Sequence, residues 1–135
     1  MINYIKQEQK YGCVIACLAM VLNTDYWTAK SWFPEKDVTG KEIGTETGIS
    51  IEFRGGKVLY NHGYLIYTKY PKSISEVEEF APIHIISIDN DSGHAHACVL
   101  KDGIIYDPYK GIKKLSDYNK VNHIVGIWEI KDHCI

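Results

Sequence analysis

Residues 14–22 are apolar at all nine positions, and this run constrains the fold more than any other feature of the sequence. A helix that is apolar on every face must be buried on every face, so the run predicts a central core helix that ends near Asn23. Nine residues are too few to cross a bilayer, and no basic segment precedes them. We therefore expect other elements to pack around this helix, with no membrane as partner.

Composition favours one soluble domain over residues 1–135, because 45% hydrophobic and 24% charged residues suffice for a real core. The net charge is −2 and the charges are scattered, so we expect no binding to nucleic acid or to an anionic membrane. There are four cysteines, but a chain of this size needs no disulfides and carries no export signal. We expect reduced thiols and a cytoplasmic location.

Helical patterns precede strand patterns along the chain. Thr24 and Asp25 can cap a second helix that turns Trp27, Trp32 and Phe33 inward and stops at Pro34. Further short helices are expected over residues 49–53 and from Ser73, with a loop over residues 35–48. Strand patterns cover residues 65–70, 83–88, 94–100, 104–106 and 124–130, with a polar loop over residues 109–122. The sequence thus predicts an α+β fold in which an N-terminal central helix packs on a C-terminal antiparallel β-sheet.

Cys13 directly precedes the core helix, and Gln7 lies six residues upstream. The N–H groups at a helix N-terminus direct partial positive charge at such a thiol and favour the nucleophilic thiolate. Catalysis by a cysteine also requires a histidine that accepts the proton and a carboxylate or amide that orients the histidine. His96 and Asp107 are the candidates.

Hairpin geometry relates these two residues. Asp102 and Gly103 predict a two-residue turn, which would pair Cys98 with Asp107 on adjacent strands. His96 shares the face of Cys98 and lies diagonal to Asp107, at roughly 7–8 Å between backbones. His94 lies one pleat further, roughly 6–7 Å along the strand. His96 is therefore the expected partner of Asp107, and His94 is expected beside the site.

The segment Gln-Glu-Gln-Lys-Tyr-Gly-Cys-Val-Ile-Ala-Cys-Leu-Ala-Met-Val-Leu over residues 7–22 carries a family resemblance, together with the residues that follow His96 and the pair Asp107-Pro108. It resembles the bacteriocin-leader-processing (double-glycine) branch of the papain-like cysteine peptidases, and free-standing single-domain members, some of them phage-encoded, are the closer comparison. The resemblance implies a papain-like fold, no cofactor and no metal. It also implies a protein or peptide substrate.

The resemblance further implies a role for each site residue. Cys13 is the nucleophile, His96 the general base and acid, Asp107 the residue that orients His96, and Gln7 the side chain of the oxyanion hole. Unlike many members of the family, the chain has Val14 and not glycine after the cysteine, which predicts a narrower site.

Other interpretations of these residues stay open. The same catalytic groups would serve a glutamine deamidase or a transamidase. A papain-like binding protein without turnover, for example an inhibitor of a host factor, is the alternative of a different class. A zinc site from Cys13, Cys17, His94 and His96 would lack a CxxC knuckle. Cys17 is expected in the core, Cys98 either beside the cleft or in the core, and Cys134 exposed.

Overall fold

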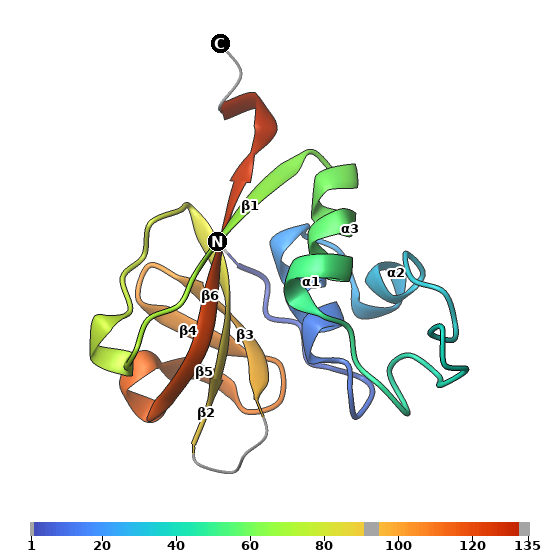
Figure 1. The fold of residues 1–135 in the computed structure, drawn as a ribbon, viewed down its shortest axis with the longest axis horizontal. Helices are drawn as coiled ribbons and strands as arrows, with labels where there is room; N and C mark the ends of the chain where they lie inside the picture. Colours follow the sequence, from blue (N-terminus) through green and yellow to red (C-terminus); the bar gives the residue numbers. More distant parts are fainter. Residues whose placement is uncertain (1, 91–94, 133–135) are drawn as a thin grey trace.

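The computed structural model describes residues 2–90 and 95–132 and has an α+β fold, as the sequence predicts (Figure 1). The helices α1 (Cys13–Val21), α2 (Tyr26–Lys30) and α3 (Gly56–Asn61) lie in one half of the molecule, and a six-stranded antiparallel sheet forms the other. The strands lie in the order β1-β6-β2-β3-β4-β5. Their bounds are Tyr64–Lys69 (β1), Ile83–Asp89 (β2), His96–Lys101 (β3), Ile104–Asp107 (β4), Gly111–Lys114 (β5) and Lys120–Glu129 (β6).

The predicted core helix is confirmed as α1, Cys13–Val21. Every residue from Val14 to Met20 is buried, and the helix packs on β3, on a second helix (α2, Tyr26–Lys30) and on a π-helix (η1, Ile51–Gly55). A second cluster of buried side chains lies apart from α1, with Ile86, Cys98 and Leu100 among its members. Helix α1 lies at the centre of the larger cluster of buried side chains, which includes all its residues from Val14 to Met20. This packing holds Cys13, the first residue of α1, against the sheet.

The hairpin between β3 and β4 has the predicted register. Lys101 pairs with Ile104, and Asp102 and Gly103 both adopt positive φ angles, of 50° and 77°. Two positive φ angles define the turn that matches the twist of the flanking strands. The ladder continues to Val99 and Tyr106, and one step further lie Cys98 and Asp107.

The second helix begins as predicted but is short, and one of its expected core residues is exposed. Asp25 caps α2 by accepting a hydrogen bond from the Thr28 amide at 2.8 Å. Tyr26 and Ala29, three residues apart, form the buried face of this helix. Trp27 therefore points outward and is 55% exposed, so the expectation that it faces the core is wrong.

Two adjacent glycines, Gly55 and Gly56, lie where one short helix passes directly into the next. The expected helix over residues 49–53 is η1, and a further helix, α3 (Gly56–Asn61), follows it directly. A Cβ on Gly56 would lie 2.8 Å from Ile66 Cδ1, so a larger residue would have to displace the end of the Ile66 side chain where α3 packs on β1. Segment 35–48 is a loop with isolated bridges, as expected.

Two other expectations differ from the structure. Only Ile74–Glu76 (η2, a 3-10 helix) forms after Ser73, because the amides of Phe80 and Ala81 bond to the His84 ring at 3.0 and 3.1 Å and not to helical carbonyls. The expected polar loop over residues 109–122 contains the edge strand β5, the 3-10 helix η3 (Leu115–Asp117) and the start of β6. A 3-10 turn, η4 (Ile130–Asp132), follows β6. In the described part of the chain, no helix has the length and apolarity needed to cross a membrane.

Candidate active site

Cys13 occupies the first position of α1, and the residue before it must be small. Gly12 is the N-cap, and a Cβ there would lie 2.0 Å from the hydroxyl oxygen of Tyr26. No side chain caps the helix, so the backbone N–H groups of its first turn remain directed at the space around the Cys13 thiol. The sequence thus places a partly buried thiol at the positive end of the core helix.

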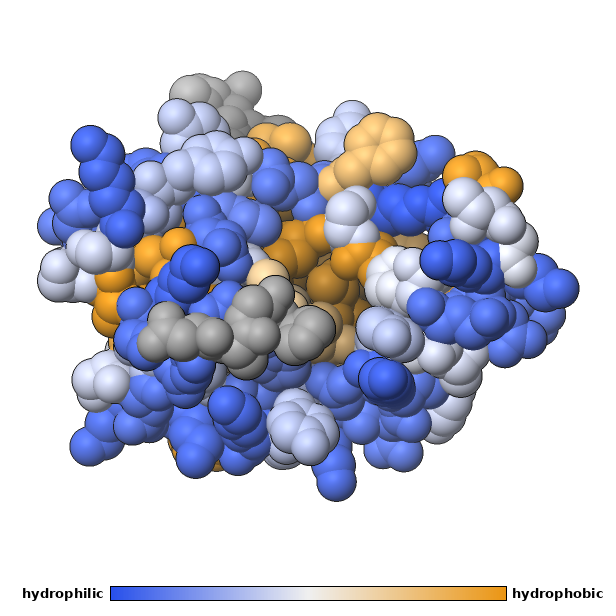
Figure 2. Space-filling view, turned by 60° about the horizontal axis from the view of Figure 1, so that its bottom comes forward, coloured by the Kyte–Doolittle hydropathy of each residue, from blue (hydrophilic) through white to orange (hydrophobic). Residues whose placement is uncertain are grey.

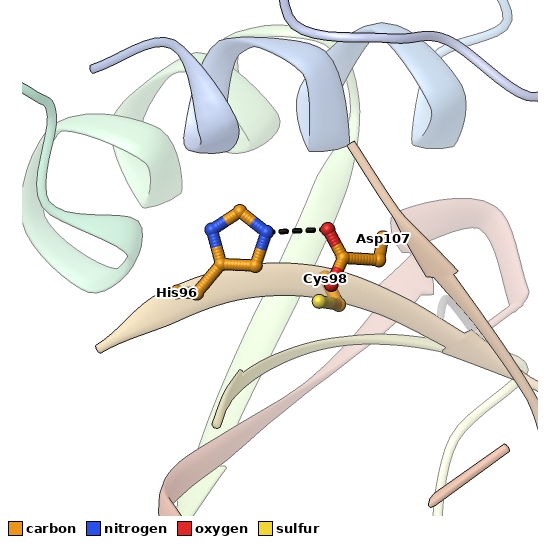
Figure 3. Close-up of side chains that lie close together, drawn as sticks. All are labelled: His96, Cys98 and Asp107. Carbon is orange, nitrogen blue, oxygen red and sulfur yellow. Dashed lines mark hydrogen bonds and ion pairs between the residues drawn. The ribbon is translucent and has the colours of Figure 1, made fainter. Parts of the chain in front are cut away.

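His96 and Asp107 lie side by side, at the start of β3 and the end of β4. His96 Nε2 is 2.5 Å from Asp107 Oδ1, and the other ring nitrogen points away from the carboxylate (Figure 3). The Cys13 thiol and the His96 ring lie close enough for each to shift the pKa of the other. Because Nε2 is occupied by Asp107, it is Nδ1 that faces the thiol. The structure therefore brings Cys13, His96 and Asp107 together in one chain of contacts.

Asp107 is fully buried, and four groups donate hydrogen bonds to its carboxylate. Oδ1 accepts from His96 and from the amides of Tyr109 and Lys110, at 2.8 and 3.0 Å, while Oδ2 accepts from the Tyr118 hydroxyl. Burial alone would raise the pKa of this carboxyl. The hydrogen bonds from His96, Tyr118 and Lys110 and the charge of His96 outweigh burial and hold the pKa well below its usual range. Asp107 is thus a buried acceptor that carries its charge at neutral pH.

The pKa values of the Cys13 thiol and the His96 imidazole are shifted in opposite directions. Burial raises the pKa of Cys13, but the His96 hydrogen bond and charge, together with the amides of Ala97 and Val14, outweigh it, and the net pKa is lowered. Burial lowers the pKa of His96, but its hydrogen bonds to Asp107 and Cys13 and their charges raise it to about 9. These shifts favour a thiolate beside an imidazolium, which is the reactive form of a cysteine nucleophile.

Gln7 lies near the site, but both hydrogens of its side-chain amide are occupied. Its backbone N–H bonds Pro108 O at 3.0 Å, which holds it next to Asp107 in space. Its Nε2 donates to the carbonyls of Gln9 and Lys10, both at 3.0 Å. Its Oε1 is buried and has no hydrogen-bond partner among the described residues. In this conformation Gln7 has no N–H group free for an oxyanion.

The Val14 side chain is buried in the core beside Gly55, with Val14 Cγ1 3.6 Å from the position that a Cβ on Gly55 would take. It therefore does not stand exposed next to the thiol. Cys17 is fully buried in the core, as expected. His94 and Cys134 lie outside the described residues.

Cys98 is fully buried beside Asp107 (Figure 3). One ligand atom each of His96, Cys98 and Asp107 lies within 4.8 Å of the others, a combination that could hold a metal ion. The nitrogen and oxygen atoms concerned already share hydrogen bonds, so the cluster is satisfied internally. The three cysteines of the described chain are free thiols.

Sequence reasoning missed the residues that hold Asp107. Tyr118 comes from the segment expected to be a polar loop, and no pattern connects it with a residue eleven positions earlier. The hydrogen bonds from the amides of Tyr109 and Lys110 could have been predicted from sequence. An aspartate side chain often accepts hydrogen bonds from backbone N–H groups two or three residues later in a turn. The Tyr4 hydroxyl, which donates to the Asp107 carbonyl at 2.6 Å, was likewise not predicted.

The chain matches no protein-family model, and no curated protein is similar to it in sequence. The site consists of a thiol with a lowered pKa, a histidine that shifts this pKa, and a buried carboxylate that binds the histidine.

Proposed function

We propose that the protein is a papain-like thiol hydrolase that cleaves a peptide or isopeptide bond, similar to the bacteriocin-leader-processing cysteine peptidases. One observation carries the proposal. The buried Asp107 carboxylate contacts one side of the His96 ring at 2.5 Å, and His96 in turn lowers the pKa of the thiol at the first turn of a buried helix. A chain of nucleophile, base and orienting carboxylate is the arrangement that covalent acyl transfer requires.

In the proposed reaction, the Cys13 thiolate attacks the carbonyl carbon and forms the C–S bond, while the carbonyl oxygen becomes an oxyanion. The Cys13 backbone N–H, at the N-terminus of α1, stabilises this charge. His96 then gives its Nδ1 proton to the leaving amine as the C–N bond breaks, which leaves a thioester on Cys13. His96 next removes a proton from water, which attacks the thioester and releases the acid. Asp107 holds the ring in one orientation throughout.

Gln7 enters this mechanism only after a rearrangement. One of its amide hydrogens must leave the carbonyl of Gln9 or Lys10 to reach an oxyanion. This observation favours, as the second candidate, a papain-like binding protein in which the hole is not assembled and turnover does not occur.

The pH dependence of alkylation tests the proposal. We expect iodoacetamide to modify Cys13 before Cys17 and Cys98, and to do so below the ordinary thiol pKa of 9.0, because the folded protein lowers the pKa of Cys13. The reactive ion pair should be lost as the pH rises through about 9, where His96 loses its proton. His96→Ala should shift the alkylation profile to higher pH, while His62→Ala, which removes an exposed histidine outside the site, should leave it unchanged. A profile that is the same with and without His96 would refute the activated thiol.

Acylation separates the two candidates. With p-nitrophenyl acetate, a hydrolase forms an acetyl group on Cys13, visible by mass spectrometry, and then loses it to water with continued release of nitrophenol. A protein that alkylates at low pH but releases no more than one nitrophenol per chain is the binding protein, and the hydrolase proposal fails.

A further inference from the structure

A second polar cluster, formed by Glu52, Tyr70 and His123, bridges the two halves of the molecule. His123 Nε2 lies 3.5 Å from Glu52 Oε1, and the Tyr70 hydroxyl donates to Glu52 Oε2 at 3.4 Å. The rings of Tyr70 and His123 are 6.0 Å apart. His123 Nε2 is buried and makes no hydrogen bond to any described residue. A buried polar atom without a hydrogen bond is costly, and it points to a missing partner.

The sheet register relates this cluster to the thiol. Helix α1, which begins at Cys13, packs on β3, and the Ala97 amide of β3 lowers the pKa of the thiol. Ala97 pairs with Ser87 on β2, and Ser87 pairs with His123 on β6. Neighbouring strands lie about 4.8 Å apart, so His123 is about 10 Å from Ala97 across the sheet.

Glu52 comes from the opposite side of this boundary. It belongs to η1, and Gly55 of the same π-helix lies against Val14, the residue after the nucleophile. The cluster and Cys13 therefore line the same boundary between the helices and the sheet. Figure 2 shows an apolar hollow between the two halves of the molecule, surrounded by polar side chains.

The cluster contains hydrogen-bond acceptors and no lysine or arginine, while Lys69 and Lys72 line the cavity beside Tyr70. Glu52 is 39% exposed, and in the described part of the chain its one ion-pair partner is His123. A Glu52 carboxylate oxygen and the Tyr70 hydroxyl oxygen can each accept a hydrogen bond, and so can His123 Nε2 in the tautomer that carries its proton on Nδ1. A lysine ammonium has three N–H donors, which matches these three acceptors in number and charge.

We propose that the cluster of Glu52, Tyr70 and His123 is a substrate subsite for a lysine side chain about two residues from the scissile bond. The inference rests on the proposed function. Two extended residues span roughly 7 Å, and the lysine side chain covers the remaining distance. The ammonium would replace the contact of 3.5 Å between His123 Nε2 and Glu52 with hydrogen bonds to both groups.

A pair of active-site-directed reagents tests the subsite without a known substrate. The two are dipeptidyl chloromethyl ketones with the same warhead and the same residue beside it, and they carry either lysine or the uncharged norleucine one residue further. We expect the lysine reagent to modify Cys13 at least about tenfold faster than the norleucine reagent. A hydrogen bond to a charged group contributes at least the free energy that corresponds to a tenfold difference in rate. Glu52→Gln should abolish the preference, and Glu35→Gln, which removes the same charge from an exposed side chain, should retain it.

The relative rates of the two reagents, on the unmodified protein and on Glu52→Gln, decide whether the lysine subsite exists. Equal rates for the two reagents on the unmodified protein would overturn it, and so would a preference that survives Glu52→Gln. If iodoacetamide still shows the low-pH reaction of Cys13 in that case, the proposed function stands and only the lysine subsite fails. If Cys13 shows no activation towards iodoacetamide either, the proposed function itself is wrong and the subsite falls with it.

Discussion

Replacing Tyr118 with phenylalanine removes one hydrogen bond from the buried Asp107 carboxylate and should destabilise the protein measurably. A hydrogen bond to a charged group contributes about 1.5–3 kcal/mol to the free energy of unfolding. The entropy of unfolding of a chain of 135 residues is about 0.28 kcal/mol/K, so the melting temperature should fall by about 5–10 °C. The Cys98 thiol, which also contacts Asp107, can donate in place of the lost hydroxyl and favours the lower end of this range.

Two comparisons isolate the hydroxyl group in this experiment. Tyr60→Phe removes a hydroxyl from a side chain that is 61% exposed and should leave the melting temperature almost unchanged. The pKa of Asp107 is lowered in the folded protein, so its stabilising contribution is present above the ordinary value of 3.8 and is lost as the pH falls further. The cost of Tyr118→Phe should shrink accordingly in acid. If the two variants Tyr118→Phe and Tyr60→Phe have the same melting temperature at pH 7, the Tyr118 hydroxyl does not stabilise the Asp107 carboxylate and the reasoning is refuted.

Two further predictions concern parts of the fold that support the site. Burial lowers the pKa of His84, so the unfolded chain takes up this proton first, and stability should fall as the pH drops below the ordinary value of 6.5. His84→Gln keeps an acceptor for the amides of Phe80 and Ala81 and should remove this part of the pH dependence. Urea unfolding at pH 8 and at pH 5.5 measures the effect. If both proteins lose the same free energy of unfolding between these two pH values, the assignment to His84 is contradicted. Gly126→Ala would place a Cβ 2.4 Å from Phe80 Cε2, and this overpacking should cost about 1–3 kcal/mol in the free energy of unfolding. Phe80→Leu should relieve part of that cost in a double-mutant cycle, and strict additivity of the two changes would argue against the contact.

The features that were predictable from sequence are those in which local pattern and tertiary structure agree. The apolar run at residues 14–22 could be accommodated only as a buried helix, and α1 begins one residue earlier, at Cys13. Asp102 and Gly103 fix a two-residue turn by their backbone preferences alone, and the turn fixes the register of β3 and β4. Register then decides which side chains share a face, so a local signal was enough to place His96 beside Asp107.

The features that escaped prediction depend on partners distant in sequence. Strand β5 lies at the edge of the sheet and alternates between partly buried and exposed residues, so it has no apolar pattern that separates it from a loop. The helix expected after Ser73 does not continue because the His84 side chain binds the amides that a helix would use. Trp27 is exposed because a five-residue helix offers one buried face, and Tyr26 and Ala29 fill it.

The same distinction separates the parts of the candidate site. Cys13, His96 and Asp107 were predictable because each lies at the end of an element that the sequence marks clearly. The electrostatics of the site depend on residues that carry no such mark: Tyr118 donates to the carboxylate from beyond β5, and the Ala97 amide reaches the thiol across the boundary between helix and sheet. A triad of the right residue types is therefore necessary for an activated thiol but does not determine its reactivity. The buried donors around Asp107 keep that carboxylate charged, the charged carboxylate raises the pKa of His96, and the protonated His96 in turn lowers the pKa of Cys13. Because each shift depends on the one before it, a change at Tyr118 should reach the thiol through two intermediates, without touching it.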